Sequence, residues 1–279
     1  MAKINNPFIV LLAGDEHEAG SLTAYATAQS GVTYSAVTDL TSYTDTQIEE
    51  ISKAISNCSD ITSSTQTIYL SDATSISIGA VRSYTLSTQE AMTDRILGFN
   101  HDALTSSTAY GEATATGKAG ITWQMVNCLD TMYKMNTNGS TTGGWNDSEM
   151  RTTTLPTIKL TMPQSLQNII KFVDKIAYSG SGSIMATSSD DLFFLAEIEI
   201  FGSAPSASWG ANEGVQYLYW STHNTDSDRI KHYDPVYYYT TQWWERSIVY
   251  SGFGAISSLG TANNDYPGNL SGVSFAYCT

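Results

Sequence analysis

Residues 233–279 read YDPVYYYTTQWWERSIVYSGFGAISSLGTANNDYPGNLSGVSFAYCT, and this stretch predicts a β-sheet that carries a tyrosine-rich surface. Seven of the chain's seventeen tyrosines fall within it, among Ser, Gly, Asn and Asp. Such mixtures are typical of binding surfaces, where Tyr supplies stiff contact area and small polar residues supply adaptable hydrogen bonds. The same composition also fits a tyrosine-rich sheet core with polar turns, because Tyr is a good strand former. Both interpretations stay open at this point.

The apolar blocks of the stretch indicate which side chains are buried. Trp243, Trp244 and Phe275 are expected in the core, and Arg246, inside an otherwise apolar strand, is expected to stack on a Trp and to be paired. One exposed face is expected to gather the residues between these blocks, namely Tyr237, Tyr238, Tyr239, Val249, Tyr250, Phe253, Asn263, Asn264 and Tyr266.

The charge of the chain limits its partners. The 279 residues carry a formal net charge of −14, and only 14% of them are charged. Nucleic acid is disfavoured as a partner, because phosphate binding needs clustered Lys and Arg, and no such cluster is seen. The apolar run Phe8–Ala13 is too short to insert into a membrane as a helix, and it lacks the features of a secretory signal. Synthesis in the cytoplasm is therefore expected.

Two regions are expected along the chain. Residues 1–45 show no sustained period and are interpreted as an N-terminal arm for attachment or oligomerisation. Residues 46–279 are expected to form an α+β domain, with helices first and a twisted antiparallel sheet afterwards.

A helix is predicted after a capping box at Thr46 and Glu49, and a second helix over residues 120–134. A third is predicted to start at Pro163, with a buried stripe that runs to Ile176. Ser148–Arg151 suggests a further short helical turn. Strand patterns cover 67–70, 81–86, 192–201 (with Ile198 and Ile200 facing in), 215–220, 243–249, 253–259 and 273–277.

Signals for catalysis are weak. His17, His101, His223 and His232 have no metal-binding spacing, and no nucleotide or hydrolase motif is present. The odd number of cysteines favours free, buried thiols at Cys58, Cys128 and Cys278. Asp190-Asp191 and Glu197 with Glu199 could be paired carboxylates, but the alternating Glu residues are interpreted as the solvated face of a strand. Asp226, Asp228, Arg229 and Lys231 are interpreted as an ion-pair set. We therefore expect no enzyme activity, no cofactor and no metal.

Several short motifs occur in an order that resembles a domain of unknown function found in bacterial surface proteins and in bacteriophage structural proteins. They are Gly144-Trp145, Ser148-x-Met150-Arg151, Leu155-Pro156, Leu192–Phe201, Ser227–Lys231, Trp243-Trp244-x-Arg246-Ser247 and Gly272-Val273-x-Phe275-Ala276. The match covers roughly residues 46–279. Ile248 stands where the family usually has Pro.

This domain is similar to the C-type-lectin-like fold, in which helices pack on a twisted antiparallel sheet. The formylglycine-generating enzymes of that fold need an active-site cysteine pair, which Cys58, Cys128 and Cys278 do not offer by spacing. The variable proteins of diversity-generating retroelements resemble the chain more closely. That resemblance implies a diversified ligand-binding surface at Tyr237, Tyr238, Tyr239, Val249, Tyr250, Phe253, Ala255, Ser257, Leu259, Asn263, Asn264, Asp265, Tyr266 and Leu270.

The resemblance implies a phage tail-tip protein that binds a bacterial surface receptor, either a protein or a glycan, without chemistry. Residues 1–45 would then contact other virion tail proteins or sister chains, with a homotrimer as one expected assembly. A bacterial cell-surface or carbohydrate-binding module is the alternative, and an enzyme of the same fold is a third hypothesis.

Overall fold

The computed structural model describes residues 22–207, 209–233 and 239–279. Its main sheet has eight strands, and their spatial order is β1-β3-β4-β5-β6-β15-β9, with β2 pairing with β4 in parallel and all other pairs antiparallel. The strands are β1 (Ala24–Tyr25), β2 (Ser35–Asp39), β3 (Thr67–Leu70), β4 (Thr74–Thr85), β5 (Ala91–Phe99), β6 (Ile121–Met125), β9 (Leu192–Phe193) and β15 (Ala276–Cys278).

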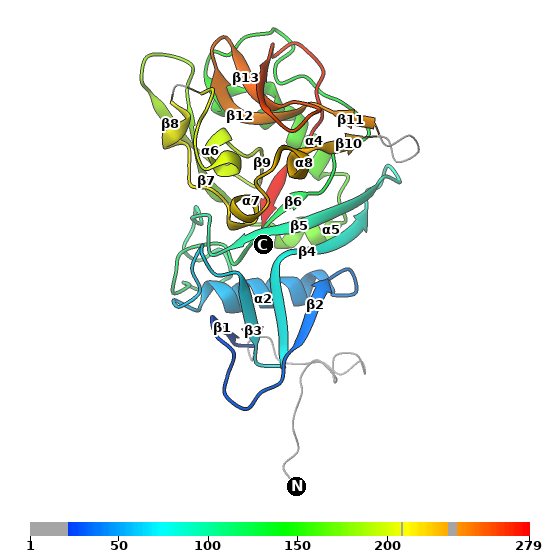
Figure 1. Cartoon of the computed structure of the whole chain (residues 1–279), viewed down its shortest axis with the longest axis vertical. Helices are drawn as coiled ribbons and strands as arrows, with labels where there is room; N and C mark the ends of the chain where they lie inside the picture. The colour runs from blue at the N-terminus through cyan, green and yellow to red at the C-terminus, as the bar shows by residue number, and fades with distance from the viewer. Residues whose placement is uncertain (1–21, 208, 234–238) are drawn as a thin grey trace.

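Three smaller sheets lie beyond the main one. They are a two-stranded ribbon, β7 (Val173–Tyr178) with β8 (Met185–Asp190), a second pair, β10 (Lys231–Tyr233) with β11 (Tyr239–Thr241), and a three-stranded sheet of β12 (Trp243–Val249), β13 (Gly252–Ile256) and β14 (Ala262–Asp265). In Figure 1, β1, β2 and β3 lie at one end of the long axis, and β12 and β13 lie at the opposite end. The expected α+β class is confirmed in this mixed arrangement of helices and largely antiparallel sheets. The expected order, helices first and the sheet afterwards, is wrong, because strands β1 to β6 precede all but one of the described helices.

Helix α2 (Asp45–Ser56) lies across the N-terminal strands of the main sheet (Figure 1) and buries Ile48, Ile51 and Ile55 against it. The expected helix is confirmed, but its capping box is formed by Thr44 and Gln47, not by Thr46 and Glu49. Thr44 accepts a hydrogen bond from the Gln47 amide at 3.2 Å, and the Gln47 side chain accepts one from the Thr44 amide at 2.8 Å. Thr44 with Gln47 and Thr46 with Glu49 both have the spacing of a capping box. The helix uses Thr44, because this residue directly precedes its first residue, Asp45.

The remaining helices among the described residues are short. They are α3 (Gly144–Asp147), the π-helical turn η1 (Met150–Thr154), α4 (Leu155–Lys159), α5 (Gln164–Ile169), α6 (Glu197–Phe201), the 3₁₀ turn η2 (Gly210–Asn212), α7 (Leu218–Thr222) and α8 (Asp226–Arg229). The helical turn expected near Ser148–Arg151 is present as α3 and η1. The helix expected at Pro163 is present as α5, but it ends at Ile169, and Val173 and Ile176 belong to strand β7.

The helix predicted over residues 120–134 is wrong. Residues 121–125 form β6, which pairs with β5 on one side and β15 on the other. All five residues of β6 are buried, so both faces of the strand carry apolar or enclosed side chains. A strand buried on both faces has no period-two alternation, and its apolar residues can then match helical spacing by chance.

Two predicted strands are helical over most or part of their length. In residues 192–201 only Leu192 and Phe193 form a strand, and Glu197–Phe201 form α6. Residues 218–222 form α7, in place of the strand predicted at 215–220. The solvated interpretation of Glu197 and Glu199 is also wrong, because both carboxylates are buried.

Of the other expected strands, β3 and β12 have the predicted ends, and β4, β13 and β15 are present with shifted ends. The core prediction for Trp243, Trp244 and Phe275 is confirmed, since none of the three is exposed. Strands β1 and β2 come from the segment interpreted as an arm, and both pair within the main sheet. Residues 22–45 are therefore continuous with the folded domain.

Candidate functional site

The site is built on the sheet β12–β13–β14, whose first strand is a rigid support. All seven residues of β12 are buried. Trp243 donates its indole N–H to the Arg229 carbonyl at 3.0 Å, and Trp244 donates to the Tyr133 carbonyl at 2.8 Å. Each ring is thus both enclosed and oriented by a hydrogen bond, as buried indoles require. The loops that follow β12 extend from a strand that cannot shift easily.

The turn between β12 and β13 presents Tyr250 to solvent. Tyr250 has a φ of 53°, a left-handed conformation that bulky residues seldom adopt, and 82% of its surface is exposed. The pairing of Phe253 with Asp265 places Tyr266 next to the same turn, and Tyr266 is 56% exposed. Two accessible phenol rings therefore flank one end of the three-stranded sheet.

Glycines in neighbouring loops allow close packing of these loops, one of them against Tyr266. A Cβ atom at Gly139 would lie 1.8 Å from the Tyr266 Oη, and one at Gly180 would lie 2.5 Å from the Thr141 carbonyl oxygen and 3.1 Å from Ile248. The Tyr266 ring thus lies directly over bare backbone. We call the resulting region the apical surface; it comprises segments 137–144, 179–184, 250–251 and 266–270, at the end opposite β1 (Figure 1).

Polar side chains beside the apical surface are held by a network of hydrogen bonds. The Gln242 amide donates to Asp265 at 2.9 Å and accepts from Asn263 at 2.7 Å. Asp265 also accepts from Asn269 at 2.7 Å and from Ser271 at 3.2 Å. These groups are preorganised, so a ligand that contacts them loses little side-chain entropy on binding.

Beneath the sheet lies a buried ionic network centred on Arg246. Its guanidinium donates to both oxygens of Glu199, at 2.5 and 3.0 Å, and to the carbonyl of Phe194 at 2.9 Å. Lys175 also donates to Glu199, at 3.1 Å, and forms an ion pair with Asp102 at 2.5 Å. The prediction that Arg246 is paired is confirmed, whereas the predicted stacking on a Trp is wrong, because within the described residues its guanidinium lies over no aromatic ring. Its pairing links β12 to α6 and, through Lys175, to β7.

The network is stable in its ionised form. Burial opposes charge on Arg246, but the Glu199 carboxylate outweighs burial and raises the pKa of the guanidinium. Burial likewise opposes charge on Asp102, and Lys175 and His101 hold the pKa of that carboxyl well below its usual range. Buried pairs with this degree of hydrogen bonding offset their desolvation cost. The groups serve as a structural brace, since all of them are buried.

Glu245 is the exception in this region. Neither of its carboxylate oxygens has a hydrogen-bond partner among the described residues, and the side chain is fully buried. Burial, with the nearby carboxylates of Glu197 and Glu213, raises the pKa of Glu245 well above its ordinary value. Gly254 is required beside it, because a Cβ there would lie 2.4 Å from the Glu245 Oε2. A neutral Glu245 is consistent with this enclosure.

The structure separates the residues expected on one exposed face. Val249 and Phe253 are buried, and the prediction that they are exposed is wrong; Ala255, named as a ligand-binding residue, is buried as well. They belong to β12 and β13, in which every residue is buried, so both faces of these strands are covered. Tyr237 and Tyr238 lie outside the described residues.

The remaining predicted residues occupy different positions. Tyr250, Tyr266 and Leu270 are exposed on the apical surface, and Asn263, Asn264 and Asp265 lie on the adjoining strand β14. Leu259 is exposed and Ser257 half-buried at the far end of β13, near α8, where the Gly260 carbonyl accepts from Arg229. Tyr239 is exposed on β11, in the β10–β11 pair.

The described His, Cys and acidic side chains considered from sequence as ligands or nucleophiles lie apart or are buried. Among residues 22–207, 209–233 and 239–279, no group of three or more His, Cys, Asp or Glu side chains is arranged to hold a metal ion. Cys58, Cys128 and Cys278 are free thiols. Burial raises the pKa of Cys128 to about 12 and that of Cys278 well above its usual range, so both are poor nucleophiles at neutral pH.

The other charged residues considered from sequence are paired. Asp190 forms an ion pair with Arg151 at 2.5 Å, and Asp191 pairs with Lys159 at 2.7 Å. Asp226 pairs with Arg229 at 2.6 Å, as expected, whereas Lys231 is buried and donates to the Val126 carbonyl at 3.0 Å. No helix in the described part of the chain is long and apolar enough to cross a membrane.

Sequence reasoning missed the partners of Arg246 in the brace, namely Glu199, Lys175 and Asp102. The signal that could have found them is the placement of Glu197 and Glu199 in the apolar run Leu192–Phe201, together with the lone Arg246 in another apolar run.

No family model, curated protein or solved structure matches this chain in comparisons with known proteins.

Proposed function

We propose that this chain is a non-enzymatic receptor-binding protein of a phage tail, that its domain is C-type-lectin-like, and that its apical surface binds the bacterial receptor. The observation that carries the proposal is the contrast between β12 and the turn that follows it. A fully buried strand, tied to α6 by Arg246 and Glu199, supports two exposed rings, Tyr250 and Tyr266. Exposed aromatic anchors on a rigid frame are the usual energetic centres of binding surfaces.

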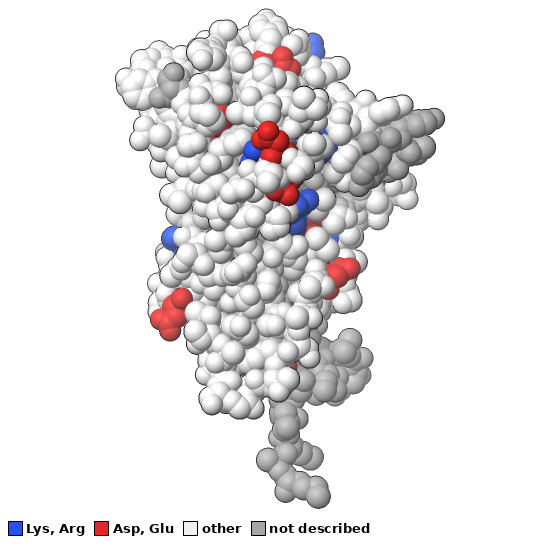
Figure 2. All heavy atoms as spheres, in the orientation of Figure 1, with Lys and Arg blue, Asp and Glu red and all other residues white. Residues whose placement is uncertain are grey.

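The composition of the apical surface indicates an uncharged region of the receptor. Segments 137–144, 179–184, 250–251 and 266–270 contain no Lys, Arg, Asp or Glu. Figure 2 shows this end of the molecule as largely free of charged side chains, apart from small patches. With a chain charge of −14, an anionic receptor would be repelled at long range. Aromatic, hydroxyl and amide groups suit a neutral glycan or an uncharged protein surface equally well.

The polarity of the molecule also supports the proposal. The N-terminal strands and the apical surface lie at opposite ends of the long axis (Figure 1). A tail protein needs this separation, because one end attaches to the particle while the other meets the host. The phage assignment itself rests on the ordered motifs from Gly144-Trp145 to Phe275-Ala276.

The test is the binding of fluorescently labelled protein to a panel of intact Gram-positive and Gram-negative bacteria, measured by flow cytometry. We expect saturable binding to a subset of strains, and loss of that binding in the double variant Tyr250→Ser/Tyr266→Ser at an unchanged melting temperature. Val32→Ser is the control, since Val32 is also exposed but lies near the opposite end. Full binding by a folded double variant would contradict the proposal.

A further inference from the structure

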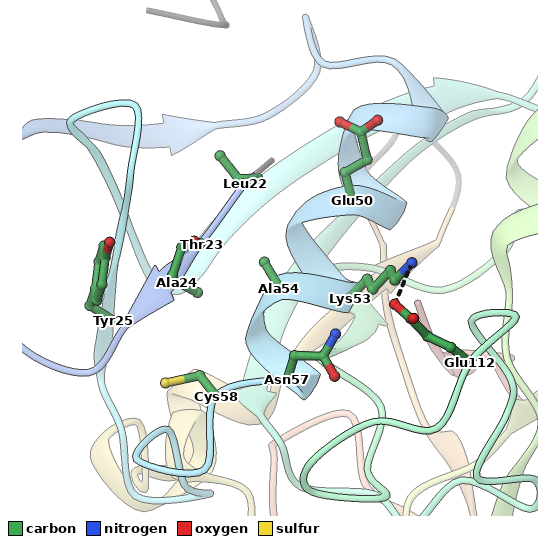
Figure 3. Close-up of a pocket in the computed structure, with 10 residues that line it drawn as sticks. All are labelled: Leu22, Thr23, Ala24, Tyr25, Glu50, Lys53, Ala54, Asn57, Cys58 and Glu112. Carbon is green, nitrogen blue, oxygen red and sulfur yellow. Dashed lines mark ion pairs between the residues drawn. The ribbon is translucent and has the colours of Figure 1, made fainter. Parts of the chain in front are cut away.

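A groove of about 400 Å³ lies between β1 and α2, at the end of the molecule opposite the apical surface. Figure 3 shows Leu22, Ala24 and Tyr25 on one wall and Ala54 and Cys58 on the other side. Lys53 and Glu112 form an ion pair across 2.9 Å at its margin. The interior is thus mainly apolar, and its charged lining residues are Glu50 and the paired Lys53 and Glu112.

The strand that forms one wall has an unused edge. β1 is the first strand in the order of the main sheet and, within the described residues, it pairs only with β3. Its backbone groups on the other side are available to a further extended segment, and free strand edges readily accept one. An occupant of this groove is therefore expected to be both apolar and able to form a strand.

The chain itself supplies such a segment close by. Phe8–Ala13 reads FIVLLA, an unbroken run of apolar residues rich in strand formers. It lies outside the described residues and precedes Leu22, which lines the groove, by only the eight residues 14–21. A linker of this length spans up to about 30 Å, and its Gly14 and Gly20 permit a reversal of direction. Tethering at this range gives an effective concentration in the millimolar range.

We propose that the groove between β1 and α2 binds the apolar run Phe8–Ala13 of the same chain. The run would lie beside β1 and cover Ala54 and Cys58, and residues 14–21 would form the return. Apolar burial supplies the driving force. This inference is independent of the proposed receptor binding, because it concerns the opposite end of the molecule.

Cys58 provides a direct probe of occupancy. It is the half-buried thiol of the three, whereas Cys128 and Cys278 are buried. We would measure its rate of reaction with Ellman's reagent in the full chain and in the double variant Ile9→Asp/Leu11→Asp. The variant should react about tenfold faster or more, which corresponds to docking favoured by at least about 1.4 kcal/mol. The control Glu16→Ala/Glu18→Ala, in the linker, should react like the unsubstituted chain. Equal rates for all three proteins would overturn the proposal.

A cross-linking experiment tests whether the occupant comes from the same chain. Leu11→Cys should form a disulfide with Cys58 on mild oxidation, yielding a cross-linked monomer on a non-reducing gel, and Cys58→Ser should abolish it. Adding Phe8→Asp/Ile9→Asp to Leu11→Cys should slow the reaction, since docking and not chance encounter brings the thiols together. A cross-linked dimer would assign the segment to a second copy and overturn the proposal. An unchanged rate, or no cross-link, would also overturn it.

Discussion

Arg246 on β12 and Glu199 on α6 form a two-pronged ion pair, with nitrogen–oxygen distances of 2.5 and 3.0 Å, in which neither side chain reaches solvent. The two residues are 47 positions apart in the chain. Their pairing joins the sheet that carries Tyr250 to the helices above the main sheet. The stability of the binding frame should therefore depend on this pair.

Removing one partner of the pair should be strongly destabilising. Arg246→Met leaves the buried Glu199 with Lys175 as its remaining cationic partner, and we expect a loss of about 3–5 kcal/mol in the free energy of unfolding. The double variant Arg246→Met/Glu199→Met should lose less than the sum of the single losses, because no charge is then stranded. Urea unfolding measures both.

The control for this prediction is a more exposed pair of the same kind. Lys53→Met removes the partner of Glu112, and it should cost less than about 1 kcal/mol. A loss for Arg246→Met that is no greater than that for Lys53→Met would show that the brace does not hold the frame.

Trp244 should contribute to stability through both packing and its hydrogen bond. Trp244→Ala removes a fully buried ring and the bond to the Tyr133 carbonyl, and it should cost roughly 3–5 kcal/mol. Trp209→Ala, at a partly exposed ring, should cost distinctly less. Thermal unfolding at a fixed pH compares the two. Similar melting temperatures for Trp244→Ala and the unsubstituted protein would refute the frame assignment.

The sequence predicted those parts of the fold where a local pattern has one physical meaning. The stripe Ile48, Ile51 and Ile55 could only be buried as a helix, and the block around Trp243-Trp244 proved to be a buried strand. The prediction from sequence failed where both faces of an element are buried, as in β6, because the alternation of apolar and polar residues that distinguishes a strand from a helix is then absent.

The candidate site was predictable only in part for a similar reason. Tyr250 and Tyr266 are exposed as expected, since they lie at a turn and after the edge strand β14. Phe253, with equally plausible neighbours, is buried because its ring packs into the hydrophobic core. Long-range contacts of this kind, like the one between Arg246 and Glu199, leave no mark within a short window of sequence.

Stability should change with pH through Asp94. This carboxyl is fully buried on β5 and accepts a hydrogen bond from Tyr277 at 2.8 Å. Burial raises its pKa from 3.8 to about 6. The folded state therefore holds the proton of the Asp94 carboxyl more tightly than the unfolded state does. The contribution of Asp94 to stability is fully present below about pH 4 and is lost as the pH rises through 6.

Asp94→Asn keeps the shape of the side chain and removes its titration. The free energy of unfolding of this variant should fall less between pH 4 and pH 6 than that of the unsubstituted protein. Chemical unfolding at several pH values in this window provides the comparison. Parallel pH profiles for the two proteins would mean that Asp94 titrates at its ordinary pKa.

Gly139 should position the Tyr266 ring, and a matched glycine separates this role from backbone strain. Gly139 and Gly111 have φ angles of +70° and +83°, so alanine is strained at both positions and each substitution should cost on the order of 1–2 kcal/mol. A Cβ at Gly139 would lie 1.8 Å from the Tyr266 Oη, whereas one at Gly111 would meet no atom within 4 Å.

Gly139→Ala should therefore shift the ring signals of Tyr266 in the NMR spectrum of protein with ¹³C-labelled tyrosine, assigned with Tyr266→Phe, and weaken binding to the cells. The control Gly111→Ala should lower the melting temperature about as much as Gly139→Ala does. It should leave both the Tyr266 signals and the binding unchanged. Unmoved Tyr266 signals in Gly139→Ala would show that the ring is not held over this loop.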